Sequence, residues 1–517
     1  MRLIACLIAR DEERNLERCL SSLSGVVDGI CLVDTGSKDR TVEIARKFGA
    51  VVGEHPWDDD FAAPRNACLE LAQGRGDWAL QVDADEEFDR SSLESLRRSL
   101  SETPSCRLVE VALLDGTDKP GSVALPRLFR LDPRIRYRRA LHESVLETLE
   151  EFGLGDPVPA PVRLIHHGYK PDAISERSKR ERNVRILRRV RDRGEADAYD
   201  LYKLGTTLPA WDPKSTDRSD ALEKAWSLAL AAPSSARSRW PWLPVLARAR
   251  ALDRANQGHL QEAWDGLGSM PEIGPAFPVR STRAEFLQRS GRIREALEEA
   301  LEVLDLATPV GLVATHGKER GDLLHLAARC ARRLGRSFLP LLEQSVSEGN
   351  IDARCDLVLL GIEKGVPSAW KDLDVLLRTH AGHPSALIAA SEAARSQGDR
   401  STSDLLLQQA SSIPSEAALR AKGRLWMRAW LGGASPAFEL PATDIENTAA
   451  TALDRVVRGL PWKPDPFLVP DSVRRTLGEI LQALLDAGRE DAVRAFAANA
   501  TGRDADLPGI TTLVEGA

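Results

Sequence analysis

The sequence predicts an α/β domain built on a mostly parallel sheet, followed by an all-α domain of helical repeats. In the first part, short apolar runs alternate with amphipathic helical patterns, which is the order of elements in βαβ units. From about residue 196 the chain is rich in Ala, Leu and Arg, has helical periodicity and shows almost no strand pattern. Its 517 residues suffice for two or three domains, each with its own core.

The first part alternates expected strands and helices, and polar residues follow most of the strands. We expect strands over 3–9, 29–33, 51–53 and 78–82, and helices over 13–24, 41–48 and 60–73. Polar clusters follow three of the strands, at 10–12, 34–39 and 83–86. Because ligands bind beyond the carboxyl ends of the strands in parallel α/β sheets, these clusters mark one candidate site.

The second part contains a repeated helix–glycine–helix joint. The segment GHLQEAW at 258–264 recurs as GRIREAL at 291–297, and GREDAV at 488–493 is similar. The spacing of 33 residues between Gly258 and Gly291 is typical of tetratricopeptide-like repeats, which stack pairs of helices into a solenoid. Gly- and Pro-rich stretches at 432–441 and 461–470 separate a last helical pair. We therefore expect domains at 1–195, 196–435 and 436–517, the last a Pro-rich linker with a terminal helical pair.

Composition narrows the class of protein. Hydrophobic residues make up 43% and charged residues 28%, as in soluble globular proteins. A net charge of −7 argues against nucleic-acid binding. No apolar stretch approaches the roughly 18–20 residues that cross a bilayer, and the first residues read as a strand rather than a signal peptide. Seven cysteines, an odd number without CxxC spacing, indicate buried reduced thiols and a cytoplasmic location.

Asp83 and Asp85, in WALQVDADEEF, carry the strongest chemical signal. Two carboxylates at i and i+2, just past an apolar strand, can turn toward one point and offer the hard oxygen ligands that suit Mn²⁺ or Mg²⁺. Such an ion would stabilise the charge that develops on a diphosphate leaving group. A DxD sequence alone also fits a solvated turn. His166 or His167 could complete the metal shell, although a structural histidine is the more common case.

Further polar side chains follow the first two strands. Asp34 ends the second strand, where its carboxylate could accept hydrogen bonds from the uracil or ribose of a nucleotide. Arg10 and Glu12 hold the corresponding position after the first strand. The alternative for Glu12 is an acidic residue that favours the start of a helix, and the alternative for Asp39 is helix capping. Asp34, Arg10 and Glu12 are therefore candidates for binding a nucleotide donor.

Several motifs occur in order over about residues 1–205: CLIARDEERNLERCLSSL, ICLVDTGSKDRTVEIARKFGA, HPWDDDFAAPRNACLELA, DWALQVDADEEF, PRLFR, LHE and IHHGYKPDA. Together they resemble family 2 glycosyltransferases, in particular the bacterial branch that includes the peptide S-glycosyltransferases of glycocin biosynthesis. The resemblance implies a GT-A fold for the first domain, with tetratricopeptide-like helices after it, and a nucleotide-sugar donor.

The resemblance also implies roles for individual positions. Glu12 and Asp34 would hold the uridine, and Arg65 would approach the base or the diphosphate. Asp83 would bind the ribose, and Asp85 would ligate the metal.

The sequence departs from the family pattern at two of these motifs. Asp11 and Lys38 stand where the family usually has Asn and Thr. These departures leave the expectation of a nucleotide donor unchanged, but they leave the identity of its base open. The QxxRW motif of processive members is absent, which favours transfer of a single sugar. Inverting transfer needs a carboxylate that accepts the proton of the acceptor, and Glu143 of the LHE motif is our candidate. The neighbouring His142 could instead contact the metal or a phosphate.

The acceptor is the least constrained part of this interpretation. Solenoids present concave surfaces that bind polypeptides, which favours a peptide or protein acceptor. Transfer to a saccharide or a lipid-linked glycan, and a non-catalytic repeat scaffold, remain alternatives, and the repeats could also form a homo-oligomer. The basic run at 177–193 is expected to be a solvated helix face. A nucleotidyltransferase is disfavoured because RDEERN, without glycine, follows the first strand.

Overall fold

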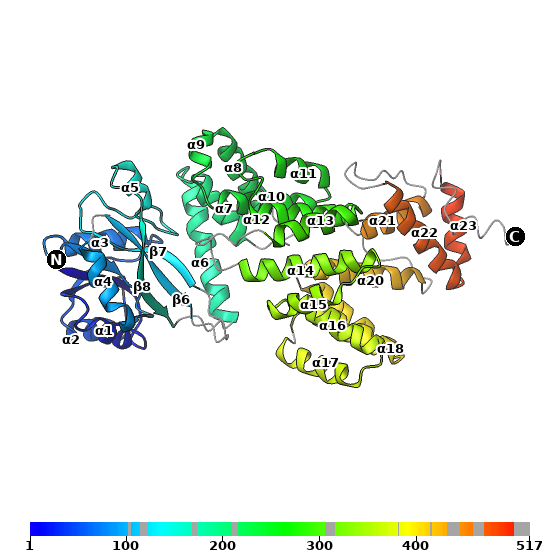
Figure 1. Cartoon of the computed structure of the whole chain (residues 1–517), viewed down its shortest axis with the longest axis horizontal. Coiled ribbons are helices and arrows are strands. Elements are labelled where there is room, and N and C mark those ends of the chain that lie inside the picture. Colours follow the sequence, from blue (N-terminus) through cyan, green and yellow to red (C-terminus); the bar gives the residue numbers. More distant parts are fainter. Residues whose placement is uncertain are drawn as a thin grey trace. The chain divides into compact units, whose positions relative to one another are not determined.

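The computed structural model divides the chain into two compact units, with the boundary between Ala196 and Asp197. It describes residues 1–101, 105–113, 122–167, 173–208, 216–305, 316–380, 382–413, 416–431, 445–458 and 470–500 (Figure 1). The predicted boundary at 435/436 and the Gly- and Pro-rich stretches at 432–441 and 461–469 lie outside these residues.

The first unit is built on one eight-stranded sheet, in the order β3-β2-β1-β4-β7-β6-β8-β5. The four strands of the N-terminal half are parallel to one another, while β7 joins β4 antiparallel and starts a mixed half of the sheet. Its strands are β1 (Leu3–Ala9), β2 (Gly29–Asp34), β3 (Val51–Glu54), β4 (Trp78–Gln81), β5 (Glu86–Phe88), β6 (Cys106–Leu113), β7 (Ser122–Arg130) and β8 (Val158–His166).

Helices cover both faces of the sheet, because the central strands are apolar on both sides. In β1, Leu7 packs in one core with Leu20 of α1, while Cys6 packs in the opposite core with Leu69 of α3. This alternation is the period of two that a strand imposes on its side chains. The helices are α1 (Leu16–Leu23), α2 (Thr41–Lys47), α3 (Ala62–Ala72), α4 (Leu93–Leu100), α5 (Leu146–Glu151) and α6 (Ala173–Asp192), with a short 3₁₀ turn, η1 (Arg90–Ser92).

The predicted strands and helices of residues 1–82 are confirmed, with small shifts at their ends. The first helix begins at Leu16 rather than residue 13, because the chain first makes a turn in which Asn15 N donates to Glu12 O (3.0 Å). The carboxylate of Asp60 accepts from Ala63 N (3.0 Å) and so caps α3, as the sequence indicated. All seven cysteines are buried thiols, also as predicted.

Every described secondary-structure element of the second unit is a helix (Figure 1). Its helices are α7 (Ala198–Thr207), α8 (Asp217–Ala231), α9 (Ser234–Arg237), α10 (Leu243–Asn256), α11 (Leu260–Gly268), α12 (Phe277–Arg289), α13 (Ile293–Leu304), α14 (His316–Arg333), α15 (Leu339–Ser347), α16 (Ile351–Glu363), α17 (Pro367–Thr379), α18 (Pro384–Ser396), α19 (Arg400–Ser412), α20 (Glu416–Leu431), α21 (Ile445–Val457), α22 (Pro470–Asp486) and α23 (Glu490–Asn499). No helix among the described residues is both long enough and apolar enough to cross a bilayer.

The repeated glycine joints have the same geometry in each helix pair. Gly258, Gly291 and Gly488 have φ values of +86°, +88° and +74°, a left-handed conformation that glycine adopts without steric cost. At each joint, the residue after the glycine donates its N–H to a carbonyl five residues earlier, as in Arg292 N to Leu287 O (2.9 Å). This is a helix C-cap of the Schellman type, and it turns the chain into the second helix of the pair.

Candidate active site

The polar clusters predicted from the sequence lie at the carboxyl edge of the parallel strands. Asp34 ends β2 beside Ala9, and its Oδ2 accepts from Gly36 N and Ser37 N (both 3.0 Å). Gly36 has a φ of +109°, so this tight turn depends on a glycine. The Asp34 carboxylate is thereby fixed at the strand end, where it is 8% exposed.

The segment after β1 is bound to the segment after β2. Glu12 N donates to Thr41 Oγ1 (2.8 Å), and Glu13 N donates to Asp39 Oδ2 (3.0 Å). Asp39 Oδ1 also accepts from Thr41 N (2.9 Å), so Asp39 caps α2 and joins the two segments. Burial raises the pKa of Glu12, against the opposing effect of its hydrogen bond from Asn15. Arg10 is half exposed beside this edge.

Two buried arginines link the acidic residues of the site. Arg65, from α3, donates from Nε to Glu143 Oε1 (2.6 Å) and from Nη2 to Asp83 Oδ1 (2.9 Å). Arg127, from β7, donates from Nη2 to Asp83 Oδ2 (2.8 Å) and to Glu86 Oε1 (3.1 Å). Guanidinium groups therefore hold both carboxylate oxygens of Asp83, and each arginine side chain is only 9% exposed.

These charges shift pKa values in opposite directions. Burial by itself would raise the pKa of Asp83, but Arg127 and Arg65 outweigh it and hold that pKa far below its usual range. Glu86 is completely buried, and burial raises its pKa to about 7 against the opposing charge of Arg127. Asp83 is thus ionised at every ordinary pH, whereas Glu86 exchanges its proton near neutrality.

A buried amide completes the arginine cluster. Gln81, the last residue of β4, lies 2.6 Å from the hydroxyl of Tyr137. With its amide oxygen turned toward the arginines, Gln81 also accepts from Arg65 Nη2 (3.0 Å). The guanidinium of Arg65 lies 5.7 Å from the centre of the Tyr137 ring. Arg65 is therefore held in place on several sides.

Asp85 and His166 lie together on a different side of the DxD segment. Antiparallel pairing of β5 with β8 brings His166 opposite Glu86, and His166 Nε2 is 3.3 Å from Asp85 Oδ2. His167 contacts Glu87 instead, with Nε2 2.8 Å from Oε2. Among the described residues, no three His, Cys, Asp or Glu side chains are grouped so as to hold a metal ion. Of the predicted ligand trio, Asp85 and His166 are brought together, and the oxygens of Asp83 are taken up by arginines.

The LHE segment reaches the same cluster through Glu143. His142 has a φ of +58°, the left-handed region that a non-glycine residue adopts only when its surroundings hold it there. The Glu143 side chain is 14% exposed and touches Arg65 through Oε1, as given above. Glu143 and Asp83 are thereby bridged by one guanidinium.

The basic face of α6 is largely exposed, as predicted, and some of its arginines also pair with the segment before α3. Arg185 donates to both oxygens of Asp59 (2.9 and 2.8 Å), and Arg189 Nη1 donates to Asp58 Oδ1 (2.9 Å). The guanidinium of Arg182 lies 5.1 Å from the centre of the Phe61 ring. The helix therefore holds the segment that leads into α3 and Arg65.

Sequence reasoning did not single out Arg127 and Gln81, and it noted Glu86 only as part of the polar segment 83–86. The signal was present for Arg127, because an arginine inside the apolar run ALPRLFR must find a buried acidic partner. Which acid it meets depends on β7 pairing with β4, which the sequence pattern did not reveal.

Comparisons with known proteins agree with this geometry. Residues 5–140 match the family model described as Glycosyl transferase family 2. A TPR repeat-containing protein of Synechococcus elongatus is 37% identical over 212 residues, covering 39% of this chain and 51% of that protein. The SPbeta prophage-derived glycosyltransferase SunS of Bacillus subtilis is 24% identical over 233 residues, covering 43% of this chain and 53% of SunS. The chain thus spans about half the length of these curated relatives.

Among solved structures, a glucosyl-3-phosphoglycerate synthase from Mycobacterium tuberculosis, in complex with Mn²⁺, UDP and phosphoglyceric acid, is 17% identical. The alignment covers 38% of this chain and 80% of the synthase, with a TM-score of 0.28. Yeast Tom70 is 12% identical and covers 72% of this chain and 77% of that one, with a TM-score of 0.32. The family match confirms the first part of the predicted organisation: residues 5–140, which form most of the sheet, are a glycosyltransferase family 2 domain, and every described element of the second unit is a helix.

Proposed function

We propose that this protein is an inverting, metal-dependent glycosyltransferase that moves one sugar from a UDP-hexose to a side chain of a peptide or protein acceptor. The observation that carries the proposal is the buried bridge from Asp83 through Arg65 to Glu143 (2.9 and 2.6 Å). It joins the DxD segment to the candidate base through one rigid group. Such a fixed arrangement suits a reaction that depends on the relative positions of donor and acceptor.

The donor would bind at the carboxyl edge of the parallel strands. Glu12 and Asp34 would accept hydrogen bonds from the uridine, with Arg10 beside them. Asp83 would accept from the ribose through lone pairs that its arginines leave open. Arg65 and Arg127 are positively charged groups fixed beside the DxD segment, and their charge favours the approach of a diphosphate.

A divalent cation would bind beside Asp85. The carboxylate of Asp85 and the imidazole of His166 are 3.3 Å apart and are both partly exposed, at 27% and 21%. Mn²⁺ and Mg²⁺ accept such oxygen and nitrogen donors and take the rest of their shell from phosphates and water. When bound, the ion would neutralise the charge of the diphosphate leaving group. Asp83, with both oxygens held by arginines, is the weaker candidate of the predicted ligands.

Glu143 would accept the acceptor proton. One of its oxygens is held by Arg65 at 2.6 Å, which fixes the carboxylate and leaves the other oxygen to face the acceptor. The general base must lie within hydrogen-bond distance of the proton it removes. A thiol acceptor needs less help from a general base, because a thiol with a pKa of about 8.5 is already partly ionised at neutral pH.

The test measures donor and acceptor chemistry separately. The protein is incubated with a panel of UDP-hexoses, with and without Mn²⁺, and UDP release is measured in the absence of acceptor. Transfer is then followed by the mass of peptides that contain Cys, Ser or Thr. Metal-dependent UDP release and addition of one hexose to a peptide are expected. Release that persists in excess EDTA would remove the metal from the proposal, and transfer only to saccharides or lipid-linked glycans would remove the peptide acceptor.

A further inference from the structure

One face of α6 lies along the segment that leads into α3. Arg189 pairs with the carboxylate at position 58 (2.9 Å), and Arg185, one turn earlier, pairs with the carboxylate at position 59 (2.8 Å). A further turn earlier, the guanidinium of Arg182 lies 5.1 Å from the centre of the Phe61 ring. Positions three and four apart share a helix face, so these three arginines follow residues 58–61 in order. Arg182 stands at the end of the series that is nearest to α3.

Arg182 differs from the other two arginines because it meets no carboxylate. Its Nε and Nη2 atoms contact an amide oxygen, Asn183 Oδ1, at 3.4 and 3.3 Å. Within the part of the chain that the structure describes, no ion pair joins Arg182 to an acid. A guanidinium has five N–H donors, and two long contacts to one amide use few of them. The side chain is half-buried, where an ionic partner stabilises a charge more than it does in open water.

The acidic side chains around Arg182 are committed to other arginines. Burial lowers the pKa of Arg182 and Arg185 adds to this effect, while Asp59 and Glu143 oppose it. Asp59 is already paired with Arg185 (2.8 Å). Glu143 is already paired with Arg65 (2.6 Å). Neither carboxylate is left to Arg182, so its charge stays uncompensated by the described residues.

Arg182 lies beside the segment that carries the candidate base. Phe61, whose ring lies against the guanidinium, donates its N–H to Ala140 O (2.8 Å), three residues before Glu143. The Phe61 ring also packs edge-on against Trp57, with the ring centres 4.6 Å apart. Both aromatic side chains are partly exposed. A partly exposed aromatic surface and one surplus cation therefore accompany the carboxylate that would accept the acceptor proton.

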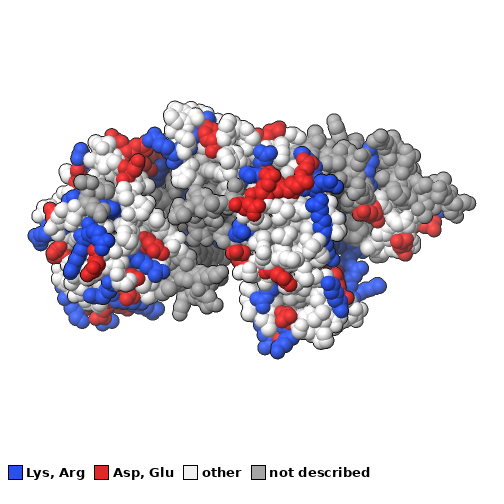
Figure 2. All heavy atoms as spheres, in the orientation of Figure 1, with Lys and Arg blue, Asp and Glu red and all other residues white. Residues whose placement is uncertain are grey.

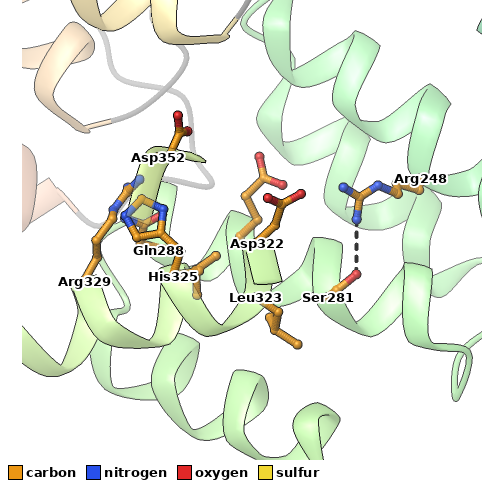
Figure 3. A pocket seen from close by; sticks show the side chains of 10 residues that line it. Arg248, Ser281, Gln288, Asp322, Leu323, His325, Arg329 and Asp352 are labelled. Atoms are coloured by element: carbon orange, nitrogen blue, oxygen red, sulfur yellow. Dashed lines mark hydrogen bonds between the residues drawn. The ribbon is translucent and has the colours of Figure 1, made fainter. Parts of the chain in front are cut away.

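The pocket of the helical unit has the opposite balance of charge. It has a volume of about 220 Å³ and is lined from α10, α12, α14 and α16 (Figure 3). Its charged or titratable lining consists of two arginines, one histidine and three carboxylates: Arg248, Arg329, His325, Glu285, Asp322 and Asp352. Figure 2 shows a similar mixture of signs on the visible face of the helical unit. Because its carboxylates outnumber its arginines, the pocket does not select an anion as the surroundings of Arg182 do.

We propose that Arg182 binds an acidic side chain of the acceptor, close to the group that receives the sugar. The carboxylate makes a charge-assisted pair with the guanidinium, whose planar fork matches its two oxygens. The rings of Trp57 and Phe61 contact apolar atoms of the same acceptor segment. The inference rests on the proposed function for the kind of acceptor, and it makes Arg182 a determinant of acceptor specificity. The donor diphosphate is the competing anion, and the KM for the donor separates the two.

Matched peptides measure this preference on the full chain, with Mn²⁺ and a UDP-hexose as donor. Each peptide carries one Ser or Cys acceptor and either Glu or Gln, placed one or two residues before or after it. We expect kcat/KM to be at least tenfold higher for a Glu peptide than for its Gln counterpart, because hydrogen bonds to charged groups are the stronger ones. Arg182→Gln should abolish this preference, and Arg182→Lys, which keeps the charge, should retain part of it. A merely structural role of Arg182 would change both rates equally and leave their ratio unchanged.

Arg180→Gln is the matched control. Arg180 is exposed on the same helix, two residues from Arg182, which turns its side chain by about 200° around the axis. Its variant should keep the wild-type preference. No preference in the wild type, or an undiminished preference in Arg182→Gln, would overturn the proposal. A raised KM for the donor in Arg182→Gln, with an unchanged ratio, would assign this arginine to the diphosphate instead.

Binding measurements separate this inference from the proposed function. Affinities of fluorescently labelled Glu and Gln peptides are measured by anisotropy in the presence of UDP and Mn²⁺. Transfer without a Glu preference removes the role of Arg182 and leaves the transferase standing. A Glu preference in binding that depends on Arg182, without any transfer, removes peptide transfer and leaves this inference standing. Absence of both transfer and binding removes both.

Discussion

The two units use charged side chains in different ways. In the first unit, charged residues far apart in the sequence converge on one buried point. Arg65 meets Glu143 across 78 positions and Asp83 across 18, and Arg127 meets Asp83 across 44. Four separate segments of chain, from α3, β4, β7 and the LHE motif, are needed to build this cluster.

In the second unit, polar partners recur at nearly constant separations along the chain. Arg254 meets Glu223 across 31 positions, Ser281 meets Arg248 across 33, and His325 meets Asp356 across 31. Each contact joins one helix pair to the next, as expected when every repeat touches only its neighbours. Convergence thus produces one site of unusual electrostatics, whereas repetition produces an extended surface. We therefore propose that the chemistry resides in the first unit and that the second unit recognises the acceptor.

Removal of the candidate metal ligand should have the largest effect, and this effect should be confined to the chemistry of the first unit. Asp85→Ala is expected to reduce transfer by a factor of about 10³ or more, because the leaving-group charge is no longer neutralised. The thermal unfolding of the helical unit should be unchanged. Steady-state rates of UDP release, with thermal unfolding measured in parallel, check both statements. Near-normal rates in this variant would move the metal to other residues.

Removal of the candidate base should lower turnover less. Glu143→Gln is expected to reduce kcat on a hydroxyl acceptor by about 10²–10⁴, with donor affinity nearly unchanged. On a thiol acceptor the loss should be smaller and should diminish as pH rises, because the thiolate forms without help. Rates on paired Ser and Cys peptides test this. Equal losses on both would assign Glu143 to positioning Arg65 instead.

Loss of a buried arginine should destabilise the first unit alone. Arg127→Leu leaves Asp83 and Glu86 without their shared cation, which is expected to cost about 3–5 kcal/mol in the free energy of unfolding. Native-state hydrogen exchange of the β4 and β7 amides measures this locally, and the helical amides should not change. Arg134→Leu is the control, since Arg134 is 52% exposed. Equal protection in both variants would show that the buried cluster contributes little.

The pKa of Glu86 predicts a pH dependence confined to the first unit. Burial raises this pKa from 4.5 to about 7, so the folded state binds more protons than the unfolded state between these values. The contribution of Glu86 to stability is therefore full below about pH 4.5 and is lost as pH rises through 7, by an amount on the order of 3 kcal/mol. Glu86→Gln should remove this slope. Parallel pH profiles of β4 amide exchange in the two proteins would contradict the assignment.

A repeated ion pair in the second unit should matter least. Glu223→Ala removes the partner that Arg250 and Arg254 share, but Arg254 keeps Glu262 (3.6 Å). The side chains of Glu223, Arg250 and Arg254 are partly exposed, at 30%, 14% and 27%. We expect a loss of about 1 kcal/mol or less, because water screens and solvates such pairs. Thermal unfolding of the helical unit gives the value. A loss as large as that of Arg127→Leu would remove the contrast between convergent and repeated charges.

Features that depend on nearby residues could be predicted from the sequence. The continuous apolar run of residues 3–9 predicted β1, and the carboxylate of Asp60 marked the start of α3. The glycines at 258, 291 and 488 marked the helix joints, because their left-handed φ is a property of the residue type. The polar ends of β1, β2 and β4 pointed to one edge of the sheet, since parallel strands bring their carboxyl ends together.

The pairing of the charged residues depends on tertiary contacts. Nothing near Arg127 in the sequence indicates Asp83 or Glu86, because their contact follows from the antiparallel addition of β7 to β4. Likewise, the basic pattern of α6 predicts an exposed face, which Arg185 keeps at 61% exposure, but it does not predict the pairing with Asp58 and Asp59. Helical and strand periods are set by steric limits on each residue, whereas an ion pair is set by whichever opposite charge the fold brings within a few ångströms.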